Sequence, residues 1–105
     1  IINVSSIGGV FGMVVFYSAA KSAALAMTNN VAIQLAPNGI AATPFAGTNT
    51  DTAEYTGKVA EFSTWFAERC AQHMDMSLPE SSVEDQANAI LFFAEDASAA
   101  VTGST

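Results

Sequence analysis

Residues 2–21 read INVSSIGGVFGMVVFYSAAK and join a short strand-like run to a helical pattern through a serine pair and three glycines. Residues 1–4 are mostly apolar and β-branched, which favours a buried parallel strand. The glycines at positions 8, 9 and 12 predict a loop. From about Phe16 the spacing of apolar residues predicts a helix, whose apolar stripe is Ala20, Ala24, Met27, Val31 and Leu35.

Beyond this helix the chain alternates between further strand and helix patterns. Residues 37–39, Pro-Asn-Gly, predict the end of the helix. Residues 40–45 predict a second strand, although Pro44 removes one hydrogen-bond donor from it. A longer helix is predicted over residues 52–76, with an apolar face formed by Tyr55, Val59, Phe62 and Phe66.

The last quarter of the chain predicts one more helix and one more strand. Residues 82–85, Ser-Val-Glu-Asp, resemble a capping box with Asp in place of the usual Glu. The helix that follows has apolar positions at Ala87, Ile90, Leu91 and Ala94. Residues 101–103 predict the entry to a third strand. The order β-α-β-α-α-β indicates an α/β fold, a partial doubly wound parallel sheet of the Rossmann-like type.

The composition predicts a core-rich protein. Half of the 105 residues are hydrophobic and only 12% are charged, a balance that suits a piece of a larger buried core. We therefore expect residues 1–105 to be an incomplete segment of a single larger domain. No run approaches the roughly 18 apolar residues that a membrane span needs, so no membrane association is expected.

Charge and cysteine content narrow the class of partner. Three basic residues against ten acidic ones give a net charge of −7, which repels phosphate backbones, so nucleic acid is not an expected partner. Cys70 is the only cysteine, which excludes an internal disulfide and fits a reducing compartment. These features predict a cytoplasmic metabolic protein.

Three kinds of chemistry could use the opening stretch, and two fit poorly. Gly8, Gly9 and Gly12 give G-G-x-x-G rather than the G-x-G-x-x-G of a dinucleotide-binding turn. A hydrolase elbow needs G-x-S-x-G, and the sequence around Ser6 has only the second glycine. The one histidine, three residues after Cys70, has no third ligand in the sequence pattern, so no metal site is predicted.

The third kind of chemistry is proton transfer by Tyr17 and Lys21. Their i, i+4 spacing places both side chains on one face of the predicted helix. A phenol has a pKa of about 10, and a neighbouring ammonium would lower it toward the working range of a general acid/base. The Ser6 hydroxyl could hold a substrate carbonyl while charge builds on its oxygen.

Three segments resemble, in the same order, the C-terminal half of the short-chain dehydrogenase/reductase family. Residues 1–9, IINVSSIGG, are similar to the strand that carries the active-site serine of the family. Residues 17–40, YSAAKSAALAMTNNVAIQLAPNGI, resemble its Tyr-x-x-x-Lys helix. Residues 81–103, SSVEDQANAILFFAEDASAAVTG, resemble its late helix and the Thr-Gly entry to its final strand.

The resemblance implies an NAD- or NADP-dependent reaction on an alcohol or carbonyl substrate. It implies that Tyr17 is the general acid/base and that Lys21 lowers the tyrosine pKa and binds the nicotinamide ribose. Ser6 would polarise the carbonyl, with Ser5 as the weaker candidate. The cofactor-binding residues would be Tyr17 and Lys21 together with Gly47 and Thr48.

Two departures from the family pattern lie close to these residues. Tyr17 follows Ser6 by 11 positions, about two fewer than the family usually shows. Ala46-Gly47 stands where the family usually has Pro-Gly. The glycine-rich first turn and the catalytic asparagine of the family would precede Ile1.

The resemblance also bears on partners and on a rival function. The helix beginning near Tyr17 commonly meets a second subunit in this family, so we expect a homo-oligomer, a dimer or a tetramer. The 52–76 helix would line a substrate pocket with Phe62, Trp65 or Phe66, or these aromatic residues would form core. The rival is a catalytically inactive, truncated or degenerate relic that keeps only packing and an oligomer interface.

Overall fold

The computed structural model describes residues 1–12, 14–47, 68, 71–72 and 81–103. The predicted helix over residues 52–76 lies almost wholly outside the described residues, and so do Phe62, Trp65, Phe66 and Thr48. The described elements are β1 (Ile2–Val4), α1 (Gly8–Phe11), α2 (Val15–Leu35), β2 (Thr43–Phe45) and α5 (Val83–Ala94), with 3₁₀ turns at Ala36–Asn38 and Asp96–Ser98.

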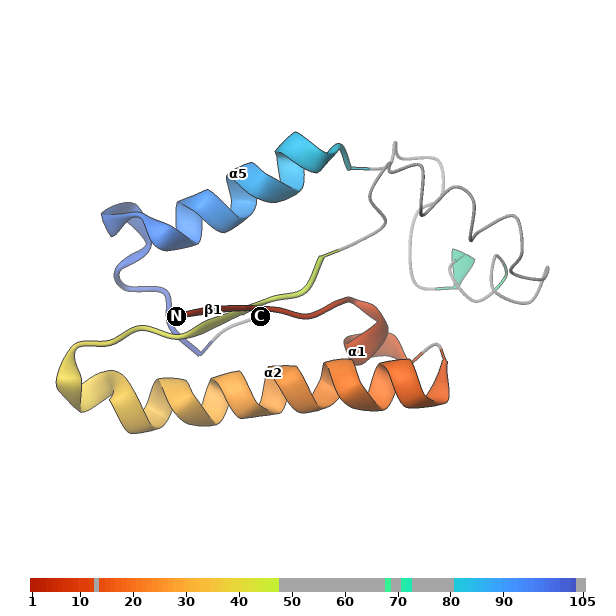
Figure 1. The fold of residues 1–105 in the computed structure, drawn as a ribbon, viewed down its shortest axis with the longest axis horizontal. Coiled ribbons are helices and arrows are strands. Elements are labelled where there is room, and N and C mark those ends of the chain that lie inside the picture. The colour runs from red at the N-terminus through yellow and green to blue at the C-terminus, as the bar shows by residue number, and fades with distance from the viewer. Residues whose placement is uncertain (13, 48–67, 69–70, 73–80, 104–105) are drawn as a thin grey trace.

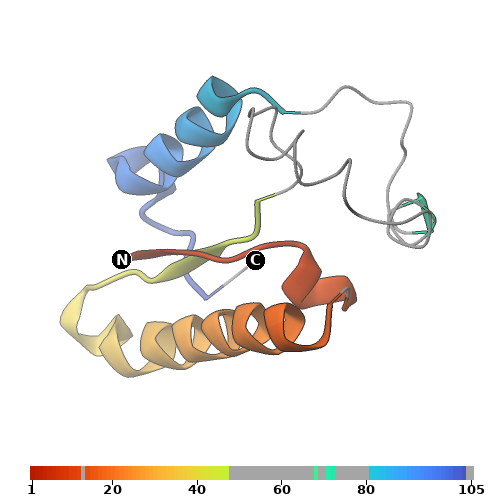
Figure 2. The same ribbon diagram turned by 45° about the vertical axis from the view of Figure 1, so that its right-hand side comes forward.

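The two strands lie side by side between two helices. Figures 1 and 2 show α2 along one face of the strands and α5 along the other. β1 and β2 are parallel, with Ile2 opposite Thr43, Asn3 opposite Pro44 and Val4 opposite Phe45. Parallel strands joined by a crossover helix and covered on both faces define an α/β fold. The predicted fold class is therefore confirmed.

The pairing of the two segments continues past the end of β2. The Ser5 amide donates to the Phe45 carbonyl at 2.7 Å, and the Ile7 amide donates to the Gly47 carbonyl at 3.1 Å. In this alternation the missing donor of Pro44 faces away from β1, so the proline costs the β1–β2 ladder no hydrogen bond. The carboxyl ends of both strands are thus held next to each other.

Residues 101–103 lie beside β2 without forming a strand there. Side chains replace the backbone ladder, because the Thr43 hydroxyl donates to the Val101 carbonyl and the Ala42 amide donates to the Thr102 hydroxyl, both at 3.1 Å. One backbone bond remains, from the Gly103 amide to the Ala42 carbonyl at 2.8 Å. The predicted third strand is therefore absent over these three residues.

The glycine-rich loop predicted after β1 contains a one-turn helix, α1. The Phe11 amide donates to the Ile7 carbonyl at 3.0 Å, and the turn ends at Gly12, whose φ is 72°. Glycine has a low helix propensity, which tertiary contacts routinely override. Here α1 packs against the first half of α2, so the loop prediction was wrong over residues 8–11.

The helix ends agree with the sequence better than the helix faces do. α2 passes into a 3₁₀ turn at Pro37, and Gly39 is left-handed with a φ of 71°. The buried residues of α2 are Thr28 and Ala32, whereas Met27 of the predicted stripe is 55% exposed. Small side chains face the sheet because they allow close approach, and longer apolar ones lie outside.

The face of α5 is also rotated from the prediction. Its half-buried residues are Gln86, Ala89, Ile90 and Phe93. Leu91, placed on the core face by the sequence pattern, is 55% exposed. Only Ile90 of the four predicted apolar positions lies on the half-buried side of the helix.

Candidate active site

The side chains of Ser6 and Tyr17 both lie close to the backbone of Gly8. A Cβ at Gly8 would lie 3.1 Å from Cε1 of Tyr17 and 3.5 Å from Oγ of Ser6. The Gly8 amide donates to the Ser6 hydroxyl at 3.1 Å, which fixes the serine side chain over the first turn of α1. Two of the three predicted catalytic residues, 11 positions apart in the sequence, are therefore brought to one place.

Lys21 lies one helical turn from Tyr17 on α2. Its Nζ is 5.7 Å from the centre of the tyrosine ring, within the range in which an ammonium is attracted to an aromatic face. Tyr17 is 47% exposed and Lys21 is half-buried. The phenol is therefore open to a ligand while the ammonium stays close to its ring.

Three small residues, Ser5, Gly9 and Ser22, join the segment after β1 to the Lys21 turn of α2. The Ser5 hydroxyl donates to the Lys21 carbonyl at 2.8 Å, and the Ser22 hydroxyl donates to the Gly9 carbonyl at 2.5 Å. Gly9 lies directly against the backbone of Lys21. These three contacts were not predicted from the sequence, although a glycine pair two residues after a serine pair is a signal of close backbone approach.

Gly47 lies at the carboxyl end of β2, next to the loop that carries Ser6. Its carbonyl accepts the Ile7 hydrogen bond, which joins the two strand ends. A Cβ at Gly47 would lie 3.0 Å from Oε1 of Gln86 on α5. Ligands of open α/β sheets bind at the carboxyl edge of the strands, where Gly47 lies. Its role in cofactor binding stays a prediction.

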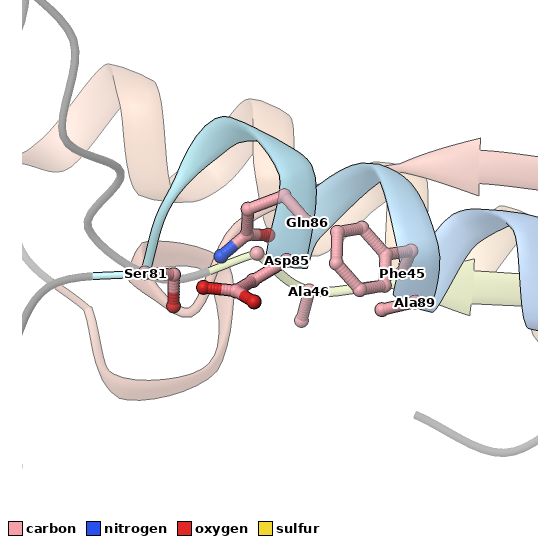
Figure 3. A pocket seen from close by; sticks show the side chains of 7 residues that line it. Phe45, Ala46, Ser81, Asp85, Gln86 and Ala89 are labelled. Atoms are coloured by element: carbon pink, nitrogen blue, oxygen red, sulfur yellow. The ribbon is translucent and has the colours of Figure 1, made fainter.

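A cavity of about 210 Å³ lies between the end of β2 and the first turns of α5. Figure 3 shows Gln86, Asp85 and Ala89 of α5 approaching Phe45 and Ala46 at this cavity. Its lining residues are Phe45, Ala46, Gly47, Ser81, Asp85, Gln86 and Ala89. In the described part of the chain, the candidate catalytic side chains thus lie near the end of β1, and the cavity lies at the end of β2.

Asp85 on the cavity rim is part of a helix cap. Its Oδ2 accepts hydrogen bonds from the hydroxyl of Ser82 at 2.8 Å and from the Ser82 amide at 3.0 Å. These bonds, the side-chain one first, hold the pKa of the Asp85 carboxyl below its usual range. The predicted capping box is confirmed, and the charged carboxylate is suited to capping rather than to proton transfer.

Two negative findings concern the described residues alone. Among them, no group of three or more His, Cys, Asp or Glu side chains could hold a metal ion. No helix within the described ranges is long and apolar enough to cross a membrane.

The fold, with Ser6, Tyr17 and Lys21 near the end of β1, agrees with what known proteins show by comparison. The family model for enoyl-(acyl carrier protein) reductase matches residues 1–105. The chain belongs to the short-chain dehydrogenase/reductase family of oxidoreductases.

Individual relatives agree with this family. The 3β-hydroxysteroid dehydrogenase of Mediterraneibacter gnavus is 31% identical over 122 residues, covering 99% of this chain and 44% of that protein. A short-chain dehydrogenase/reductase from Burkholderia thailandensis has a TM-score of 0.77 at 26% identity, over 98% of this chain and 39% of its own.

A third relative is similar in fold alone. NAD⁺-bound xylitol dehydrogenase has a TM-score of 0.81 at 22% identity, over 98% of this chain and 45% of its own. The chain therefore spans less than half the length of each of these three relatives.

Proposed function

We propose that this chain is the C-terminal segment of a single Rossmann-like domain that transfers a hydride between NAD or NADP and an alcohol or carbonyl substrate. The observation that carries the proposal is that Ser6 and Tyr17 both lie close to Gly8, with Lys21 one helical turn from Tyr17. The similarity to a hydroxysteroid dehydrogenase supports a hydroxyl or carbonyl group as the reacting centre.

In the oxidative direction Tyr17 acts as the general base and takes the hydroxyl proton of the alcohol. The Lys21 ammonium stabilises the phenolate form of Tyr17, which is the form that accepts this proton. Ser6 donates a hydrogen bond to the substrate oxygen and holds it against Tyr17. A nicotinamide, when bound, would supply the acceptor for the hydride of the carbinol carbon, so that oxidation would give the carbonyl and reduction would run in reverse.

The residues present fit the nicotinamide end of the cofactor. The backbone at Gly47 lies beside the Ser6 loop, and its lack of a side chain lets the Gln86 side chain approach it closely. Tyr17, Lys21, Gly47 and Thr48 would hold the nicotinamide and its ribose. The described residues contribute only to this end of a dinucleotide, in agreement with a C-terminal segment.

We also infer that the intact protein is a homo-oligomer, a dimer or a tetramer. The outer face of α2 exposes apolar side chains, with Phe16 88% exposed, and Lys21 is the only charged residue in the helix. Exposed apolar faces of this kind mark interaction surfaces. The predicted cytoplasmic location stays a prediction.

The rival hypothesis of an inactive relic was based partly on the shortened stretch between Ser6 and Tyr17. α1 accommodates this stretch, because its single turn returns the chain to α2 and keeps the two side chains together. This geometry supports the enzyme. An open reading frame upstream encoding a glycine-rich βαβ unit would support it further, and a genuine start codon at Ile1 would support the relic.

The test is Tyr17→Phe in the full-length protein, assayed by nicotinamide fluorescence over a panel of carbonyl substrates. Loss of general acid–base catalysis is expected to lower kcat by about 10²- to 10⁴-fold. Cofactor binding, measured by fluorescence titration, should stay within about twofold because the ring is kept. Equal turnover of the two proteins would remove Tyr17 from the mechanism and with it the proposed function.

A further inference from the structure

Ser5 joins three segments of the chain at the end of β1. Its amide donates to Phe45 at 2.7 Å, and its hydroxyl donates to the Lys21 carbonyl at 2.8 Å. The residue is only 5% exposed, so these bonds are shielded from water. The Lys21 carbonyl also accepts the regular α-helical bond from residue 25, which means that Ser5 adds a second partner to an already bonded group.

The opposite side of Ser6 is anchored to the same turn of α2. A Cβ at Gly9 would lie 2.7 Å from the carbonyl carbon of Lys21 and 2.9 Å from the Ser22 nitrogen, so the two backbones are in direct contact. The Ser22 hydroxyl closes this contact with its bond to the Gly9 carbonyl. Ser6 therefore lies between two anchors, at residues 5 and 9, that both hold the Lys21 turn.

We propose that Ser5 is a positioning residue, whose hydroxyl fixes the turn of α2 that carries Lys21 relative to Ser6 and Tyr17. This inference rests on the proposed function. The Lys21 side chain begins at this turn of α2. A shift of the turn relative to Ser6 would therefore shift the position from which the ammonium reaches the active site. A misplacement of about 1 Å can cost about 10²-fold in rate.

The matched control is Thr28, which lies on α2 two turns after Lys21. Its hydroxyl donates to the Ala24 carbonyl at 2.7 Å, and the residue is fully buried. Ser5→Ala and Thr28→Val each remove one buried hydroxyl that bonds to an α2 carbonyl. Both variants are expected to lower the Tm, and only one of them changes the Lys21 turn.

The experiment compares both variants with the wild type in the full-length protein. Ser5→Ala should lower kcat for alcohol oxidation by roughly tenfold, because the Lys21 ammonium moves from its place. The value of kcat/KM for the alcohol should fall as well, because the ammonium that supports proton transfer is displaced. Thr28→Val should leave both measurements unchanged, and Ser5→Thr, which keeps the hydroxyl, should restore both toward wild type.

A second readout does not depend on turnover. With tyrosine labelled at the ¹³Cζ position, NMR reports the surroundings of each ring, and the Tyr17 signal is the one lost in Tyr17→Phe. Ser5→Ala should change the chemical shift of this signal, because the Lys21 turn moves relative to the ring, and Thr28→Val should not. An unchanged Tyr17 signal in Ser5→Ala, or equal changes in both variants, would overturn the positioning role. Absent turnover in the wild type would instead count against the proposed function alone.

Discussion

The carboxyl ends of β1 and β2 both carry small residues, but their packing differs. At the end of β1, Ser5 and Gly9 bind the chain tightly to α2, and contacts there are made to backbone atoms. At the end of β2, a Cβ at Gly47 would meet the Gln86 and Phe45 side chains, and a cavity of about 210 Å³ lies beside it. Both ends carry a small residue. Among the described residues, the first end is packed against backbone, and the second borders a cavity.

This difference matches the division of labour in the proposed reaction. Proton transfer needs groups fixed within a fraction of an ångström, which close packing of glycine and serine against a helix provides. A cofactor or substrate needs room and an accessible backbone. Substitutions that add one methyl group at each end should therefore have graded effects, decided by what the new Cβ meets.

Gly9→Ala is expected to have the largest effect. Its Cβ would lie 2.7 Å from the Lys21 carbonyl carbon, and backbone at this distance can respond only if α1 and α2 move apart. Overpacking of this kind costs about 3 kcal/mol, which exceeds the roughly 1 kcal/mol that alanine gains over glycine in a helix. We expect a clear fall in the free energy of unfolding, measured with urea, together with loss of turnover.

A control for Gly9→Ala is Ser22→Ala, which removes the hydrogen bond to the Gly9 carbonyl but adds no atom. It should be destabilising by about 1 kcal/mol, a typical value for one hydrogen bond. If Gly9→Ala proved no more destabilising than Ser22→Ala, the close packing of α1 against α2 at Gly9 would be contradicted.

Gly8→Ala and Gly47→Ala form the next comparison, with intermediate effects of different kinds. The Cβ at Gly8 would lie 3.1 Å from Cε1 of Tyr17, so the ring must shift by a few tenths of an ångström. We expect kcat to fall roughly tenfold with little change in cofactor KM. The Cβ at Gly47 would displace only the end of the flexible Gln86 side chain, so stability should hold while cofactor KM rises several-fold.

Steady-state kinetics with varied cofactor separates these two outcomes. Gly8→Ala should change kcat, because Gly8 lies against Tyr17. Gly47→Ala should change the cofactor KM, because Gly47 lines the proposed cofactor site. A fall in kcat for Gly47→Ala as large as that for Gly8→Ala would contradict the assignment of the catalytic side chains to the end of β1 and the facing part of α2.

Much of the fold was accessible from the sequence because the signals are local. The strand at residues 1–4, the helix stop at Pro37 and Gly39, and the capping box before α5 each depend on a few neighbouring residues. The loop predicted at Gly8 was wrong because its helical turn depends on contact with α2, which lies several residues away in sequence.

The faces of the helices were harder to predict, for a related reason. Met27 and Leu91 belong to apolar stripes by spacing, yet each is more than half exposed. Thr28, which is polar, is fully buried because Asn3 of β1 donates a hydrogen bond to its hydroxyl at 2.9 Å. Spacing finds the period of a helix, but the choice between two apolar faces depends on the close approach of small residues to the sheet.

The candidate site shows the same limit. The spacing of Tyr17 and Lys21 predicted their shared face, and Ser6 was predicted to join them from a strand end. The supporting role of Ser5 could not be derived, because a hydroxyl bonded to a helix carbonyl 16 residues later leaves no local pattern.

The smallest expected effect lies beside the cavity, in the cap of α5. The hydrogen bonds from Ser82 lower the pKa of Asp85 from its usual value of 3.8, so the carboxylate form is favoured in the folded state. Its contribution to stability is therefore complete above pH 3.8 and is lost as the pH falls through the lower folded value. The Tm difference between wild type and Asp85→Asn should be present at pH 7 and shrink below pH 3.8.

The matched control is Glu84→Gln, which removes a charge from the same first turn but leaves the hydrogen bonds between Ser82 and Asp85 in place. Because Asp85 is fully exposed, solvent screens the interaction and the Tm change should amount to a few degrees at most. A Tm difference for Asp85→Asn that stays constant between pH 7 and pH 3 would mean that the cap acts through shape alone. The charge of Asp85 would then contribute nothing to the stability of the α5 N-terminus.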